Sequence, residues 1–148
     1  MTTAFVTAGA GFLLAVLCFD LMFDVQVRRG EQRDEGVASI AAYYRRVTLE
    51  AYPMNRLVAL VMLGTLTALV VQVADDDAPR WAAITSLVLT LGATGLAMGH
   101  TFRTGARLGS GRGAADEQHR LARLMLRDHL VCLAAIVAVL VLQLGFAR

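Results

Sequence analysis

The chain contains four long stretches without a single aspartate, glutamate or arginine, at residues 1–19, 57–74, 81–102 and 130–147. A helix needs about 20 predominantly apolar residues to cross a bilayer, and each stretch approaches or meets that length. The pattern predicts an all-α protein, a bundle of four transmembrane helices that forms a single domain over 1–148. We place the spans at about 4–26, 53–74, 81–102 and 127–146, with longer connections at 27–52 and 103–126.

The composition agrees with a membrane protein. Hydrophobic residues make up 57% of the chain and the mean hydropathy is +0.58, whereas soluble domains are usually about 45–50% apolar. The first stretch lacks a basic start and a small-residue cleavage site, and its helical pattern continues past Asp20 and Asp24. We therefore expect it to remain in the mature protein as a span rather than to be removed as a signal peptide.

The distribution of charge predicts the orientation. All 14 basic residues are arginines, and only Arg80 and Arg148 lie outside the two longer connections and their edges. Short loops rich in arginine stay in the cytoplasm, so we expect both connections there and both termini on the non-cytoplasmic side. The use of arginine without lysine, with abundant Ala, Val, Leu and Gly, is typical of a GC-rich bacterial gene. We predict a multi-pass protein of the bacterial cytoplasmic (inner) membrane.

The first connection contains an amphipathic pattern. Val37, Ile40, Tyr44, Val47 and Ala51 recur at helical spacing, with charged residues off that line. This pattern predicts a helix that lies at the membrane surface or leads into it.

Glycines mark two further features. The second connection begins with a glycine-rich segment, 105–113, which we expect to be a flexible linker before one long uninterrupted helix from 114. Gly95 and Gly99 form a GxxxG pattern, and Gly9 and Gly11 lie in the first span. Small residues mark close helix packing in membranes, so we expect contacts here, within the bundle or between protomers.

The first span carries two acidic side chains into its apolar helix. Asp20 and Asp24 are four residues apart, on one face with Gly9 and Leu13. A charge at mid-bilayer costs about 2.5–3.5 kcal/mol on insertion scales, and two carboxylates at this spacing repel each other. Either an arginine lies between them, or one carboxyl holds a proton, or a cation is bound.

The other spans bring polar groups to the same predicted depth. These groups could lock the helices together, or they could line a cavity with an apolar floor that binds an amphiphile whose charged head meets arginines. The candidate ligand-binding residues are Asp20, Asp24, Glu50, Asn55, Arg56, His100, Arg103, Arg127, Asp128 and His129.

The sequence gives weaker support for a metal site, a redox cofactor or a proton path. His100 and His129 lie at matched depth on different spans, as a haem with two histidine ligands requires, but the chain has 3 histidines in all. We predict no metal site and name no cofactor. Cys18 and Cys132 lie in apolar stretches, so we expect inert free thiols. A proton path is hard to draw because the outer half contains little beyond Gln72 and Gln143.

Four spans with long basic first and third connections and a short second one resemble the layout of MAPEG proteins, membrane enzymes and relatives of eicosanoid and glutathione metabolism. Arg46, Glu50 and Pro53, ahead of the second span, look like that family's charged start of its second helix. Val47 and Tyr43 stand where the family has asparagine and arginine. The resemblance implies a trimer that holds a thiol tripeptide among arginines.

Two functional hypotheses follow. The first is a small membrane protein that is an accessory or structural subunit, or a binder of a lipid or quinone-type amphiphile, through the polar cluster at the cytoplasmic end. The second is a membrane enzyme, MAPEG-like or a cofactor-dependent oxidoreductase, that acts on a lipophilic substrate. The expected partners are membrane lipids and either further copies of the chain or a larger membrane complex, with no role for nucleic acid.

Overall fold

The computed structural model describes residues 1–28, 33–50, 52–75 and 78–146, and within these ranges the ordered elements are all helical. Four helical stretches are long and apolar enough to cross a membrane, as predicted. They are Thr2–Arg28, Pro53–Ala74, Arg80–Gly109 and Ala115–Phe146. The third is longer than expected because the helix continues well past residue 102.

The first half of the chain forms one span, a crossing helix and the start of the second span. Helix α1 (Thr2–Asp24) ends in a single 3₁₀ turn, η1 (Val25–Arg28). The crossing helix α2 (Arg33–Arg45) continues as a π-helical turn, η2 (Arg46–Glu50), before the second span, α3 (Tyr52–Ala74). Pro53 lies in the first turn of α3, where its missing N–H costs no helical hydrogen bond.

The second half contains two long helical rods. The third span begins as α4 (Arg80–Leu96), passes through the π-helical turn η3 (Ala97–Thr101) and ends as α5 (Phe102–Gly109). The fourth span is α6 (Ala115–Phe146), a single helix of 32 residues. The prediction of one long final helix is therefore confirmed.

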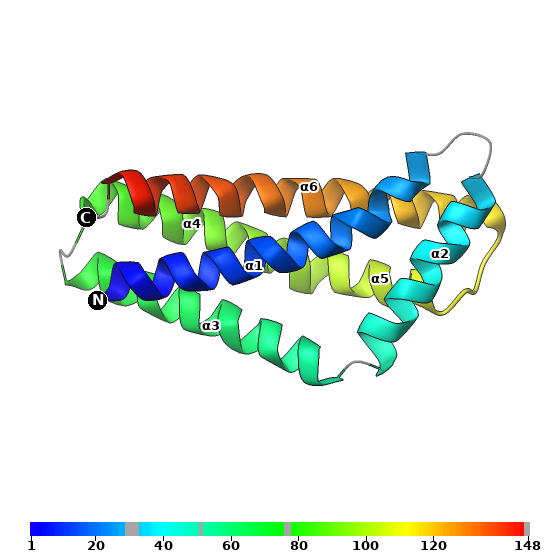
Figure 1. Ribbon diagram of the computed structural model, residues 1–148, viewed down its shortest axis with the longest axis horizontal. Coiled ribbons are helices and arrows are strands. Elements are labelled where there is room, and N and C mark those ends of the chain that lie inside the picture. Colours follow the sequence, from blue (N-terminus) through cyan, green and yellow to red (C-terminus); the bar gives the residue numbers. More distant parts are fainter. Residues whose placement is uncertain (29–32, 51, 76–77, 147–148) are drawn as a thin grey trace.

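The four spans form a ring of neighbours in the order α1, α3, α4, α6, and α6 returns to α1. Each span is antiparallel to the one before it along the chain (Figure 1). We call the end with the N-terminus and the α3–α4 connection the terminal end. The opposite end, which α2 crosses, we call the α2 end (Figure 1). Toward the α2 end, α3 diverges from α1.

The core between the spans is a narrow apolar cluster. It contains Val6, Ala10 and Leu13 of α1, Leu69 of α3, and Ile136 and Val139 of α6. Large apolar side chains also face outward, among them Leu60, Val88 and Val141, which are 60% exposed or more. An apolar exterior on four long helices suits a lipid environment, because every backbone polar group is satisfied inside a helix.

Helix α2 packs against protein along its apolar face. Val37, Ile40 and Tyr44 are buried, and they share a cluster with Leu108 of α5 and Met125 of α6. The prediction of an amphipathic helix is right for Val37, Ile40 and Tyr44, whereas Ala51 of the predicted line lies outside the described residues. Neighbouring helices cover this apolar face where we expected the membrane surface. The helix lies across the α2 end of the bundle, as Figure 1 shows.

The glycine-rich segment is a linker only in part. Gly105 and Gly109 belong to helix α5, which packs against α2. A Cβ atom at Gly109 would lie 2.7 Å from the backbone nitrogen of Arg45, so only glycine permits this approach. The expectation of a flexible linker over 105–109 is wrong because these glycines serve helix packing. Gly111 and Gly113, with φ of 64° and 111°, form the actual turn.

The expected glycine contacts fall into two groups. A Cβ atom at Gly9 would overlap the hydroxyl of Thr65, so α1 and α3 meet at this glycine as predicted. Gly11, Gly95 and Gly99 instead have no such neighbour within 4 Å. Contacts within the bundle at these three positions are therefore ruled out in the described structure. A contact between protomers at Gly95 and Gly99 stays a prediction.

Candidate functional site

Two carboxylates of α1 and one imidazole of α6 meet at the α2 end. His129 Nδ1 lies 2.6 Å from Asp24 Oδ2, and His129 Nε2 lies 3.8 Å from Asp20 Oδ2. The side chains of Asp24 and His129 are 0% and 8% exposed, and that of Asp20 is 13% exposed. Of the three alternatives for this pair, no arginine contacts the aspartates within the described residues, and the imidazole of His129 lies beside both of them.

Two tyrosines of α2 complete this cluster. The Tyr43 hydroxyl donates to Asp20 Oδ1 at 2.7 Å, and the Tyr44 hydroxyl donates to Asp24 Oδ1 at 2.9 Å. The Tyr43 ring stacks on Phe23, with ring centroids 4.1 Å apart. Adjacent residues reach both aspartates because the aspartates are one helical turn apart and face α2 as a pair. We call Asp20, Asp24, Tyr43, Tyr44 and His129 the acid–base cluster.

The tyrosines remain neutral donors in this setting. Burial raises the pKa of Tyr43 above its usual value, and the hydrogen bond to Asp20 raises it further. Burial also raises the pKa of Tyr44, and the negative charge of Asp24 acts in the same direction. Both phenols therefore keep their protons at physiological pH and stabilise the carboxylates by hydrogen bonding.

A second polar group forms on the neighbouring face of α6, because Asp128 directly precedes His129 in the helix. Asp128 is buried, and its Oδ2 lies 2.5 Å from His100 Nδ1 of η3. Its other oxygen accepts a hydrogen bond from Arg127 at 3.2 Å. The His100 side chain is 43% exposed, so this pair connects the interior to the periphery of the bundle. Because Asp128 and His129 are adjacent in sequence, α6 carries one polar contact to the third span and one to α1 and α2.

The remaining candidate residues do not join either group. Asn55 donates to the carbonyl oxygen of Val47 at 2.7 Å and so ties the start of α3 to η2. Glu50, Arg56 and Arg103 are exposed. The sequence placed these residues at the same depth as the aspartates. However, α3 diverges from α1 toward the α2 end (Figure 1), which separates its charged start from the acid–base cluster.

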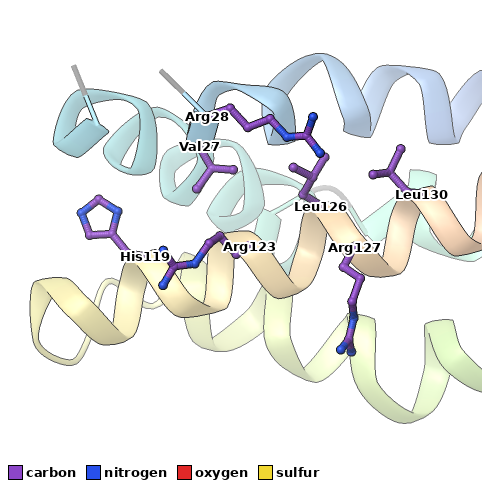
Figure 2. Close-up of a pocket in the computed structure, with 7 residues that line it drawn as sticks. All are labelled: Val27, Arg28, His119, Arg123, Leu126, Arg127 and Leu130. Carbon is purple, nitrogen blue, oxygen red and sulfur yellow. The ribbon is translucent and has the colours of Figure 1, made fainter. Parts of the chain in front are cut away.

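A separate hollow of about 480 Å³ lies between η1 and the first half of α6. Its lining combines basic and apolar side chains, namely Val27, Arg28, His119, Arg123, Leu126, Arg127 and Leu130. We call it the arginine hollow. Figure 2 shows Arg28 reaching from the end of α1 while Arg123 comes from α6, and the guanidinium of Arg127 points away toward the third span.

His119 closes one side of the arginine hollow. Its Nε2 lies 2.8 Å from Asp34 Oδ1 of α2. Its Nδ1 atom is buried and has no hydrogen-bond partner within the described parts of the chain.

Comparisons of the chain with known protein families, with curated proteins and with solved structures found no match. The function therefore has to be argued from the residues themselves.

The described residues contain no preformed metal site. Among the residues that the structure describes, no group of three or more His, Cys, Asp or Glu side chains could hold a metal ion. His100 and His129 each contact a different aspartate through Nδ1. Cys18 and Cys132 are free thiols, exposed and buried respectively.

Sequence reasoning missed Tyr43, Tyr44, Arg28 and Arg123 as site residues. Tyr44 was assigned to the apolar face of the crossing helix, which is correct, but its hydroxyl then reaches Asp24. The one available signal was the pair of adjacent tyrosines in a helix next to buried aspartates. The positions of Arg28 and Arg123 in the sequence indicate only the orientation in the membrane. The two residues are far apart in the sequence, and only the fold brings α6 beside η1.

Proposed function

We propose that this multi-pass membrane protein binds an anionic lipid, or a similar anionic amphiphile, in the arginine hollow. The observation that carries this proposal is the combination of Arg28 and Arg123 with the apolar side chains of Leu126 and Leu130 around one hollow. A guanidinium group binds phosphate oxygens through paired hydrogen bonds, and leucine side chains suit the adjoining acyl region.

The position of the hollow supports the same ligand class. It lies where the first and fourth spans reach the α2 end, beside the connections that hold most of the arginines. The positive-inside rule assigns this end to the cytoplasmic leaflet, which carries the anionic lipids. Each basic residue near such a surface contributes about 1 kcal/mol to lipid attraction.

The alternative function is a membrane enzyme, MAPEG-like or a cofactor-dependent oxidoreductase. The Asp24–His129 contact is the observation that favours it, because a histidine held by a carboxylate is a common general base. Binding without chemistry is better supported, because His129 is not among the described residues that line the hollow. Glu50 and Arg46, which carry the resemblance to MAPEG proteins, are exposed.

A binding experiment with matched variants tests the proposal. The protein is placed in nanodiscs of neutral phosphatidylcholine with increasing phosphatidylglycerol, and bound anionic lipid is counted by native mass spectrometry after release. We expect the double variant Arg28→Gln/Arg123→Gln to retain anionic lipid about tenfold or more less tightly than the wild type.

The control is Arg107→Gln/Arg112→Gln, which removes two exposed arginines from the same end of the molecule. We expect the control to retain lipid like the wild type. An equal loss in both double variants would mean general attraction to charge and would refute a site in the hollow. Stabilisation of the wild type by glutathione or a quinone, with no response to anionic lipid, would instead favour the enzyme.

A further inference from the structure

Within the acid–base cluster, His129 Nε2 and Asp20 Oδ2 would both be hydrogen-bond acceptors if no further proton were bound. Asp24 Oδ2 lies 2.6 Å from His129 Nδ1, and an ionised carboxylate can only accept, so with Asp24 ionised this contact requires a hydrogen atom on Nδ1. The other ring nitrogen, Nε2, faces Asp20 Oδ2 at 3.8 Å. A neutral imidazole with its hydrogen on Nδ1 has only a lone pair on Nε2. That lone pair would then be directed at a negatively charged oxygen.

The charges around this position favour one more proton. The ionisable side chains that face the Asp20–His129 pair are Asp24 of α1, Tyr43 and Tyr44 of α2, Asp128 of α6 and, through Asp128, His100 of η3. The phenols are neutral, and no arginine contacts Asp20 or Asp24 within the described ranges. Without a further proton, two carboxylates would carry two negative charges inside a largely apolar bundle, which is costly.

We propose that Asp20 and His129 form a binding site for one exchangeable proton, and that this proton holds α1, α2 and α6 together. With the proton present, Nε2–H and Asp20 attract each other, or a protonated Asp20 donates toward Nε2. Asp20 accepts from Tyr43 at the same time, so α2 is joined to the same site as α1 and α6. The partial exposure of Asp20 gives the site a route for proton exchange.

Loss of the proton has a defined structural consequence. The two aspartates, one helical turn apart, then carry two negative charges with no compensating proton between Asp20 and His129, and Asp20 faces the Nε2 lone pair. The repulsion acts at the junction of three helices. The site therefore links pH to the stability of the contact between α1, α2 and α6, independently of lipid binding in the arginine hollow.

We expect the folded protein to become less stable as the pH rises. The folded protein retains the proton above the pH at which the unfolded chain has lost it, so the folded state binds one proton more. Raising the pH through this window should increase the unfolding equilibrium constant by up to about tenfold per pH unit. The change Asp20→Asn removes one charge and places an amide donor beside Nε2, so this variant should lose most of the dependence.

Unfolding of the full-length protein in bicelles, followed by denaturant titration between about pH 5 and pH 9, measures this effect. The matched control is Asp116→Asn, because Asp116 is an exposed carboxylate in the first turn of α6, away from the acid–base cluster. It should keep the wild-type pH dependence. If Asp20→Asn and the wild type respond to pH alike, the proposal is overturned.

A second measurement uses the wild type and does not depend on folding of a variant. Nitrogen NMR of protein with labelled histidines, assigned with His129→Gln, reports the protonation of each ring nitrogen. We expect the Nε2 signal of His129 to change with pH while Nδ1 stays protonated throughout. If the Nε2 signal of His129 does not change across the whole pH range, Nε2 is either always protonated or never protonated. Either result would refute an exchangeable proton at this site.

Discussion

Gln72 of α3 and Gln143 of α6 exchange two amide hydrogen bonds, of 3.0 and 3.1 Å, across the bundle near the terminal end. Their helices are not neighbours in the ring. Gln72 also donates to Thr3 of α1 and Gln143 to Ser86 of α4, so one polar side chain from each span takes part. The two glutamines are thus a junction of all four spans.

Removing one glutamine of this junction should destabilise the bundle. The change Gln143→Leu leaves the buried amide of Gln72 with fewer partners, and we expect a loss of about 1–2 kcal/mol in the free energy of unfolding in bicelles. The double change Gln72→Leu/Gln143→Leu should cost less than the sum of the single changes, because no partner amide is left behind. The control Leu144→Ala alters a residue that is 60% exposed. Additive effects of the two glutamine changes would contradict the junction.

The packing of α2 on α5 depends on glycine at one position. We expect Gly109→Ala to destabilise the protein by about 1–3 kcal/mol, because the added methyl group would meet the backbone of Tyr44 and Arg45. Gly64→Ala is the matched control, since a Cβ there meets nothing within 4 Å. It should be neutral or stabilising by up to about 1 kcal/mol. Denaturant unfolding compares the two, and similar losses would argue against the close contact.

The raised pKa values of Tyr43 and Tyr44 predict a loss of stability at high pH. Their folded-state pKa lies above the unfolded value of about 10, so the folded state holds extra protons in alkaline solution. Their contribution is complete below about pH 10 and is lost as the pH rises through the folded value.

Absorbance of the phenolate measures this effect directly. The chain has 3 tyrosines, and at about pH 11 we expect no more than one to ionise while the protein stays folded. The double change Tyr43→Phe/Tyr44→Phe should leave that folded titration unchanged. Ionisation of two or three phenols in the folded protein would contradict the burial of these hydroxyl groups.

The orientation in the membrane can be tested with single cysteines in a protein that lacks Cys18 and Cys132. We expect Ser110→Cys, in the exposed α5–α6 connection, to react with an impermeant maleimide only from the cytoplasmic side. Asp75→Cys, at the exposed end of α3, should react only from the opposite side. The reverse pattern would invert the topology and would place the arginine hollow in the outer leaflet.

Local pattern was enough to predict the four long apolar helices and the amphipathic character of α2. Bilayer thickness sets the length of a spanning helix, and helical periodicity sets which residues share a face. The aspartates could be expected to need partners for the same kind of reason, because an uncompensated charge in an apolar helix is costly.

Only the tertiary structure decided which partners those would be. His129 and two tyrosines of α2 meet Asp20 and Asp24, whereas Glu50 of η2 and Arg56 of α3 remain exposed. Residues at equal depth can still lie on helices that diverge, as α1 and α3 do (Figure 1). Close contacts such as that of Gly9 with Thr65 set the angle between these two helices, and they do not involve the acid–base cluster. Sequence determines how deep each side chain lies along its own helix, and helix packing determines which of these side chains meet.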